Sequence, residues 1–146
     1  MASESAFEIR LVKSWETASL VDLYRAGGWW QEHWDPGGLP ALIAGSFAFA
    51  IAIDNASGRT VGMGRVISDG VSDAYIQDVV VHPEFRKKGV GKQLLRALLA
   101  RCKEADMTWI SLIAEPGMEG FYENLGFRPM NRFVPMIYSE GSDKNS

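Results

Sequence analysis

Cysteine is almost absent from this chain, which has a single one, Cys102, among 146 residues. A lone cysteine cannot form an internal disulfide, and this is typical of proteins that work in a reducing compartment. We therefore expect a cytoplasmic protein. Cys102 follows Leu94, Leu95 and Leu98 at helical spacing, so we expect it to pack in a core and not to act as a nucleophile.

Long apolar runs and a positive net charge are absent as well. No apolar stretch approaches the ~20 residues that span a bilayer, and the N-terminus lacks the charged and then apolar order of a secretory signal. The net charge is −3, whereas a domain that binds nucleic acid is normally basic. These absences argue against a membrane protein, a secreted protein and a nucleic-acid-binding domain.

The composition that is present suits one globular domain. A chain of 146 residues has the usual size of a domain, and a hydrophobic fraction of 47% is enough for a core. We assign residues 1–138 to this single domain. Residues 139–146 are polar and carry no apolar anchor, so we expect this tail to be disordered.

Hydropathy patterns and turn residues predict an α+β fold. Period-two or continuous apolar patterns predict strands at 7–13, 46–54, 59–68, 74–82, 108–114 and 133–138. Helical spacing predicts helices at 14–28, 39–45, 89–104 and 115–127. The order β-α-α-β-β-β-α-β-α-β describes a central mixed, mostly antiparallel sheet with flanking helices, which becomes parallel where the long helix crosses over.

The stretch "VVVHPEFRKKGVGKQLL" sets three cations before a Gly-x-Gly turn, between a strand and a helix. Arg86, Gly89 and Gly91 fit the pattern R-x-x-G-x-G at every position. Glycines remove the Cβ atoms, so that backbone N–H groups at a helix N-terminus can close on an anion. The turn is predicted to bind an anion such as a pyrophosphate.

Two other phosphate-binding patterns do not fit this turn. A Walker loop needs a glycine where Arg86 stands and a serine or threonine where Gln93 stands. A dinucleotide fingerprint needs a third glycine where Leu94 stands. A nucleotide triphosphatase and a Rossmann-type dinucleotide site are therefore not predicted.

Two blocks of the sequence resemble the GNAT superfamily of acyl-CoA N-acyltransferases. "IQDVVVHPEFRKKGVGKQLL" is similar to that family's central strand, cofactor loop and helix, and "FYENLGF" is similar to its C-terminal signature. The resemblance is close over residues 76–127 and extends over the whole chain in the order of elements. It implies the GNAT-like fold and acetyl-CoA as co-substrate, with no metal.

The resemblance also implies which residues bind acetyl-CoA. The backbone of Val79, Val80 and Val81 would pair with the pantetheine arm as an added strand would. The loop and the start of the helix would hold the pyrophosphate, through Arg86, Lys87, Lys88, Gly89, Val90, Gly91 and Lys92.

Transfer of the acetyl group needs a neutral amine, a stabilised carbonyl oxygen and a proton for the leaving thiolate. The family match makes Tyr122 the general acid for that thiolate, and a backbone N–H near Val79 or Val80 can stabilise the carbonyl oxygen. Glu115 stands where many relatives carry asparagine, which offers it as a general base. Its other interpretation is a charge at a helix N-terminus, and both stay open.

The acceptor is predicted to meet the side chains of Tyr75 and Gln77, because alternate residues of a strand share a face. By the same alternation Asp78 is expected to point the other way. Trp29 and Trp30 are predicted to line the acceptor site. With Glu32, Trp34 and Asp35 they would form an aromatic, acidic pocket suited to an amine, or they pack over a sheet edge or a dimer contact.

A metal site built from Glu32, His33 and Asp35 is not expected, because the chain has only two histidines and His82 is far away in the sequence.

The predicted function is transfer of acetyl from acetyl-CoA to a primary amine of a small molecule or an amino-acid-like acceptor, by direct attack. One alternative is a non-catalytic acyl-CoA-binding sensor. A second alternative is an anion- or RNA-binding domain, and the acidity of the chain disfavours this second one. A homodimer is predicted through the apolar stretch 133–138.

Overall fold

A computed structural model describes residues 5–140 of the chain. The chain divides into two compact units, Met1–Leu112 and Ile113–Ser146, which we call the N-terminal unit and the C-terminal unit. Each unit is described by itself. The assignment of residues 1–138 to one domain stays a prediction, and most of the predicted disordered tail lies outside the described residues.

The N-terminal unit is an α+β structure built on one mixed sheet. Its strands are β1 (Phe7–Leu11), β2 (Ala48–Asp54), β3 (Thr60–Ser68), β4 (Asp73–Val81) and β5 (Trp109–Leu112). Its helices are α1 (Thr17–Ala26), α2 (Leu39–Gly45) and α3 (Val90–Glu104), with short 3₁₀ turns at Pro36–Gly38 and Pro83–Phe85. The described strands lie in chain order, antiparallel except for the parallel pair β4–β5, as the sequence predicts.

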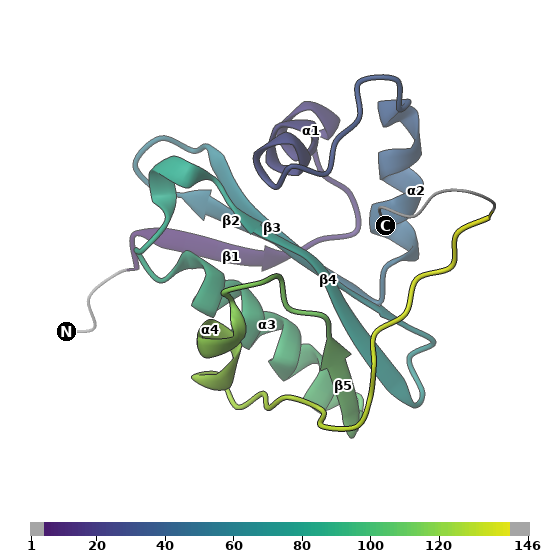
Figure 1. Ribbon diagram of the computed structural model, residues 1–146. Helices are drawn as coiled ribbons and strands as arrows, with labels where there is room; N and C mark the ends of the chain where they lie inside the picture. Colours follow the sequence, from purple (N-terminus) through teal and green to yellow (C-terminus); the bar gives the residue numbers. More distant parts are fainter. Residues whose placement is uncertain (1–4, 141–146) are drawn as a thin grey trace. The chain divides into compact units, whose positions relative to one another are not determined.

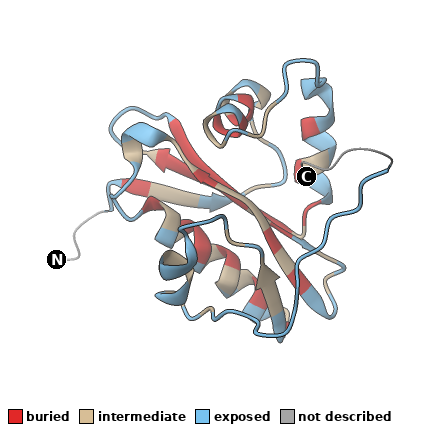
Figure 2. Cartoon of the chain, in the orientation of Figure 1, coloured by how far each residue is buried: buried red, intermediate tan, exposed pale blue. Residues whose placement is uncertain are grey.

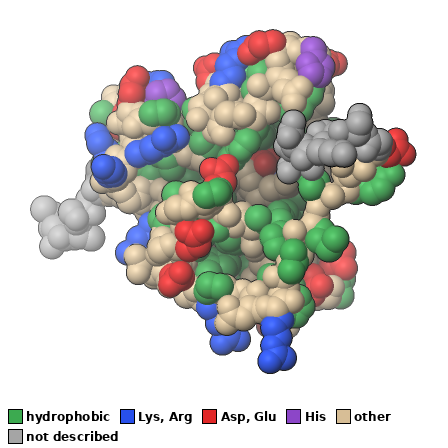
Figure 3. All heavy atoms as spheres, viewed as in Figure 1, with side chains coloured by type: hydrophobic (Ala, Val, Ile, Leu, Met, Phe, Trp, Pro, Cys, Tyr) green, Lys and Arg blue, Asp and Glu red, His purple; other side chains and the backbone are tan. Residues whose placement is uncertain are grey.

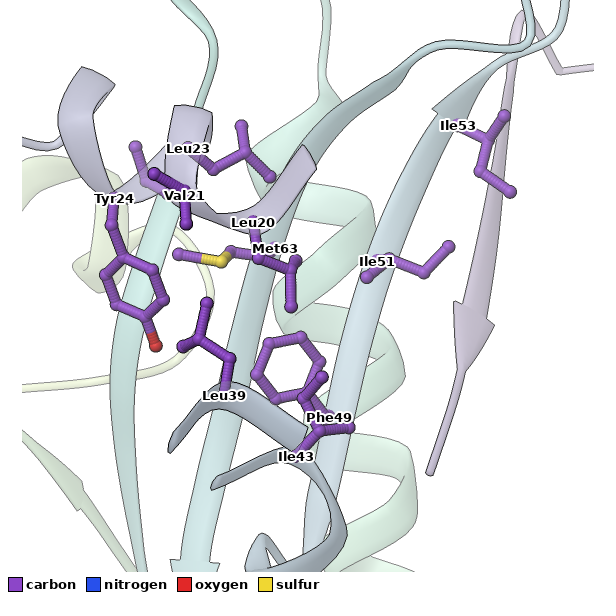
Figure 4. Packing of buried hydrophobic residues seen from close by; sticks show 11 residues of the cluster. Leu20, Val21, Leu23, Tyr24, Leu39, Ile43, Phe49, Ile51, Ile53 and Met63 are labelled. Carbon is purple, nitrogen blue, oxygen red and sulfur yellow. The ribbon is translucent and has the colours of Figure 1, made fainter. Parts of the chain in front are cut away.

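Helices cover both faces of this sheet. Figure 1 shows α1 and α2 on one side and α3 on the other. Aliphatic side chains of α1 and α2 and the ring of Tyr24 pack with Phe49, Ile51 and Met63 of the sheet in one cluster (Figure 4). Burying each such side chain contributes roughly 1.5–3 kcal/mol to the stability of the fold.

The opposite face has two glycines on β3 that let α3 approach closely. A Cβ atom on Gly62 would lie 3.0 Å from Cδ1 of Leu94, and one on Gly64 would lie 3.2 Å from Cδ1 of Leu98. Leu94 and Leu98 are fully buried, and Figure 2 shows buried positions along β2, β3 and the sheet-facing side of α3. Cys102 is also buried there, as predicted, and burial raises the pKa of its thiol.

In the C-terminal unit the described residues form one helix, α4 (Glu119–Glu123), within the predicted range 115–127. The predicted last strand at 133–138 is wrong, because these residues take no regular secondary structure. Pro135 in the middle of the stretch lacks a backbone N–H, and a strand needs a neighbouring strand to satisfy its backbone. The apolar alternation of this segment could not reveal whether such a neighbour exists.

Among the described residues, no helix has the length and apolar character that crossing a membrane requires.

Candidate active site

Strands β4 and β5 pair over only part of their length. The parallel pairing joins residues 73–76 of β4 to β5 and ends at Ile76, whereas β4 continues to Val81 beside β3. Among the described strands, none pairs with residues 77–81 on the β5 side. Apart from the carbonyl oxygen of Val81, which accepts a hydrogen bond from Nε of Arg86, the backbone N–H and C=O groups on this edge are therefore available to an extended ligand.

A β-bulge at Asp78 interrupts β4 where this open stretch begins. Met63 pairs with Val80 and Arg65 pairs with Gln77, so that Asp78 and the residue after it together oppose a single residue of β3. Asp78 has a left-handed backbone with φ of 59°. The bulge turns the Asp78 side chain to the α1 side of the sheet, so the expectation that it points away from Gln77 is wrong: strict alternation fails at a bulge.

Asp78 is the centre of a half-buried polar cluster. Its Oδ2 accepts hydrogen bonds from the Tyr24 hydroxyl at 2.7 Å and from Nε of Arg65 at 2.7 Å. Nη2 of Arg65 donates to Oε1 of Gln77 at 3.1 Å. Burial and the neighbouring carboxylate raise the pKa of the Tyr24 phenol well above its usual range, so Tyr24 acts as a hydrogen-bond donor at neutral pH.

The predicted anion loop has two left-handed residues before α3. Lys87 has φ of 64° and Gly89 has φ of 83°, and no side chain caps the N-terminus of α3. Nε of Arg86 donates to the carbonyl oxygen of Val81 at 3.0 Å and ties the loop to the end of β4. The first N–H groups of α3 carry partial positive charge and are surrounded by the full charges of the lysines and Arg86, which suits an anionic ligand.

Phe85 holds this loop from the side, a role that sequence analysis missed. Arg59 lies over the Phe85 ring at 5.6 Å, as does Lys88, and Phe7 meets it edge-on at 6.2 Å. Arg59 also pairs with Glu84 at 3.1 Å. Figure 3 shows basic, acidic and histidine side chains together at this end of the N-terminal unit, at its upper left. Contacts with neighbouring elements therefore hold the loop in place. The only feature of the sequence that pointed to this role of Phe85 was an aromatic residue among cations.

The predicted acceptor residues of β4 share the α1 side of the sheet. Gln77 bonds to Arg65, and Tyr75 lies two residues earlier on the same face by alternation. Trp29 and Trp30 pack against the core cluster, with ring centroids 6.3 and 6.4 Å from that of Tyr24. These residues are therefore brought to one side of the sheet.

The acidic residues beside the tryptophans are not gathered into a metal site. Glu32 pairs with Arg25 at 3.0 Å and Asp35 caps the turn at Gly37. No cluster of histidine, cysteine or acidic residues suited to a metal occurs within the described part of the chain. The aromatic pocket predicted from Glu32 and Asp35 therefore loses part of its acidic character, because the Arg25 guanidinium neutralises Glu32.

In the C-terminal unit, Tyr122 on α4 lies between aromatic neighbours. Its ring meets Phe121 at 5.0 Å and Phe127 at 5.8 Å, both nearly perpendicular. Burial, and to a smaller extent the nearby charge of Glu115, raise the pKa of the Tyr122 phenol. The phenol is therefore protonated at neutral pH and can donate a hydrogen bond.

Comparison with known proteins agrees with this arrangement. Residues 45–129, more than half of the chain, match the family described as "Acetyltransferase (GNAT) domain". The chain is 40% identical over 74 residues to "Uncharacterized N-acetyltransferase ycf52" of Porphyra purpurea, an alignment that covers 51% of this chain and 42% of that protein. The chain thus spans less than half the length of that relative.

Two solved structures share the fold over almost the entire chain. A GNAT-family acetyltransferase of Streptococcus pneumoniae is 26% identical with a TM-score of 0.77, over 91% of this chain and 97% of that one. AAC(6')-Iy, solved with the bisubstrate analog CoA-S-monomethyl-acetylneamine, is 20% identical with a TM-score of 0.69, over 92% and 99% of the two chains. At that identity the second likeness shows the fold alone.

The chain belongs to the GNAT family of acetyltransferase domains. The predicted fold class is confirmed, and the prediction of an acyltransferase is confirmed at the level of the family.

Proposed function

We propose that the protein transfers an acetyl group from acetyl-CoA to a primary amine of a small molecule or an amino-acid-like acceptor. The observation that carries this proposal is the open edge of β4 directly before a loop with left-handed residues and an uncapped helix. An extended amide chain that ends in a pyrophosphate is complementary to both parts. The solved complex of AAC(6')-Iy with a CoA-containing analog is consistent with such a ligand.

In this proposal acetyl-CoA binds along β4 and the loop that follows it. The pantetheine amides pair with the backbone of Val79, Val80 and Val81. The pyrophosphate binds the backbone N–H groups and cations of residues 86–92. Because Arg86 already donates one N–H to Val81, its contribution includes holding the loop in place for the other residues.

The chemistry is direct attack. The amine nitrogen forms a bond to the thioester carbon and loses a proton to water or to Glu115, the candidate base. The carbon–sulfur bond breaks, and the sulfur leaves as a thiolate. Tyr122 is the proposed donor to that sulfur. A phenol with a pKa of ~10 is a weaker acid than a thiol with a pKa of ~8.5, and burial raises the pKa of Tyr122 further. Tyr122 therefore acts mainly by donating a hydrogen bond to the developing charge.

The acceptor side is proposed to include Trp29, Trp30, Tyr75 and Gln77. Glu115 stays a candidate general base, although its charge raises the pKa of Tyr122, which suggests that it also keeps that phenol protonated. The cytoplasmic location and the homodimer stay predictions.

The cofactor site is tested by Gly91→Glu, which places a side chain and a negative charge at the N-terminus of α3. We expect calorimetry on the folded variant to show loss of acetyl-CoA binding. Gly45→Glu is the matched control, because Gly45 ends α2, is exposed and has open space around its Cα. Unchanged affinity in the Gly91 variant would overturn the loop assignment.

Release of free thiol from acetyl-CoA with a panel of primary amines tests the transfer. We expect at least one amine to raise thiol release far above the rate without acceptor. If acetyl-CoA binds and no amine has this effect, the chain is an acyl-CoA-binding sensor and not an enzyme.

A further inference from the structure

The guanidinium of Arg65 has an unused binding edge. An arginine has five N–H donors, and Arg65 uses one on Oδ2 of Asp78 and one on Oε1 of Gln77. Its remaining N–H groups, on Nη1 and Nη2, have no partner among residues 5–140. One N–H of Nη1 and one N–H of Nη2 point in the same direction and form the open edge of the guanidinium. Such an edge can bind a carboxylate through two parallel hydrogen bonds.

The carboxylate of Asp78 also has an unused oxygen. Tyr24 and Arg65 both donate to Oδ2, and Oδ1 has no partner within the described part of the chain. In that part no fully buried side-chain nitrogen or oxygen lacks a partner, so Oδ1 of Asp78 and Nη1 of Arg65 reach solvent. A carboxylate oxygen accepts hydrogen bonds, and an amine is its natural donor.

The cluster lies where an acceptor would meet the thioester. Asp78 comes two residues after Ile76, the last residue of β4 that pairs with β5. The bulge directs its side chain to the α1 side, beside Gln77. An amine on Oδ1 would therefore lie at the beginning of the open stretch of β4.

We propose that the pair Arg65–Asp78 binds a free α-amino acid as acceptor, with the carboxylate on the open edge of Arg65 and the amino group on Oδ1 of Asp78. This inference rests on the proposed acetyl transfer and narrows its acceptor. The side chains of Arg65 and Asp78 are 17% and 15% exposed, and charge-assisted hydrogen bonds are stronger in such a place than on an open surface. A simple amine would use only Asp78, and the amino end of a peptide has no neighbouring carboxylate for Arg65.

The first test compares each proteinogenic amino acid with its carboxamide and with the amine that lacks the carboxylate. We expect the best amino acid to exceed its carboxamide in kcat/KM by about 10- to 100-fold, the effect of losing one hydrogen-bonded charge. Equal or better transfer to the carboxamides would overturn the proposal.

Two variants test the residues. Arg65→Gln should remove the preference for the carboxylate. Because this change leaves Asp78 without its cation, the double variant Arg65→Gln with Asp78→Asn removes both charges and avoids an unpaired carboxylate. Both variants should bind acetyl-CoA as the original protein does. Arg10→Gln changes an exposed arginine on β1; it is the matched control and should keep the preference for the carboxylate. If the double variant also kept this preference, the assignment would be contradicted.

Equilibrium binding separates this inference from the proposed function. Titration of amino acids and their carboxamides, followed by tryptophan fluorescence with and without CoA, requires no turnover. Tighter binding of the amino acids would support the inference even if acetyl transfer were not observed. Equal binding of the two sets would overturn it even if acetyl transfer to other amines were found.

Discussion

The left-handed backbone of Asp78 decides which groups meet on the α1 side of the sheet. A non-glycine residue in this conformation costs roughly 1–2 kcal/mol. The hydrogen bonds from Tyr24 and Arg65 to its carboxylate compensate for that cost. The same bonds leave Tyr24 protonated, and this has a measurable consequence at high pH.

We expect the free energy of unfolding to fall as the pH rises above ~10, the pKa of an unperturbed tyrosine. Burial and Asp78 raise the pKa of folded Tyr24, so its stabilising contribution is complete below the unfolded pKa and is lost as the pH rises toward the folded one. Each such phenol adds a slope of at most about 1.4 kcal/mol per pH unit. Urea unfolding at a series of pH values from neutral to alkaline measures this slope.

Tyr24→Phe should make this slope shallower, although it also removes the bond to Asp78 and lowers stability at neutral pH. Tyr138→Phe is the control, because it removes the hydroxyl of a tyrosine that is 82% exposed. If Tyr24→Phe and the original protein had the same slope of unfolding free energy against pH, the Tyr24 phenol would titrate in the folded protein as it does in the unfolded chain, against the prediction.

Tyr122→Phe keeps the ring contacts with Phe121 and Phe127 and removes only the hydroxyl. We expect kcat to fall by roughly 10- to 1,000-fold, while the affinity for acetyl-CoA stays nearly unchanged. The lower end is favoured because a thiolate is already a fair leaving group. Steady-state kinetics with the best acceptor, together with calorimetry, measure both quantities. Unchanged kcat with chemistry rate-limiting would leave Tyr122 as a packing residue, and lost affinity would make it a binding residue.

The element that shapes the proposed cofactor site is the loop between β4 and α3. Arg86 ties it to Val81, and Phe85 ties it to Arg59 and Lys88. Its two left-handed residues have different costs, because a glycine adopts this conformation freely and a lysine does not.

Gly89→Ala should destabilise the fold by about 1–2 kcal/mol, since a Cβ atom there has open space but φ is 83°. Gly45→Ala is the matched control in α2, also with open space, and should stabilise by roughly 0.5–1 kcal/mol. Lys87→Gly should change stability by less than about 1 kcal/mol, because relief of strain offsets the added freedom of the unfolded chain. Urea unfolding measures all three, and equal effects of the two alanine variants would refute the role of the left-handed conformation.

At the scale of the whole molecule, the predicted homodimer would form through the exposed segment 133–138. Val134, Met136 and Ile137 are 76%, 89% and 73% exposed, and exposed apolar side chains so close together in the chain are a candidate for a contact between copies. The dimer predicted from sequence therefore has a surface that can be tested directly.

Light scattering at high concentration should give about twice the chain mass of 16.1 kDa. Ile137→Asp should shift the mass to that of a monomer, because a charge in an apolar contact is costly to bury. Val71→Asp is the control, since Val71 is 78% exposed in the turn between β3 and β4. A monomeric original protein would rule out the dimer.

Local sequence patterns predicted most elements and part of the candidate site. The strand, glycine spacing and helix around the loop are contiguous, so the pattern R-x-x-G-x-G by itself indicates an anion loop. The strand predicted at 133–138 failed, because apolar alternation reports a preference and not the presence of a partner strand. The contact between Arg59 and Phe85 was not predicted, because the two residues are 26 positions apart in the sequence and no local pattern connects them.

The amino-acid sequence was sufficient for the family, the order of elements as far as α4 and the position of the loop, because each depends on residues adjacent in the chain. The cluster around Asp78 depended on tertiary structure. Tyr24 and Asp78 are 54 positions apart, and the bulge that joins them arises from the pairing of β4 with β3. A one-residue change in that pairing turns a side chain to the other face of the sheet, so only the folded sheet decided that Asp78 lies with Arg65 on the α1 side.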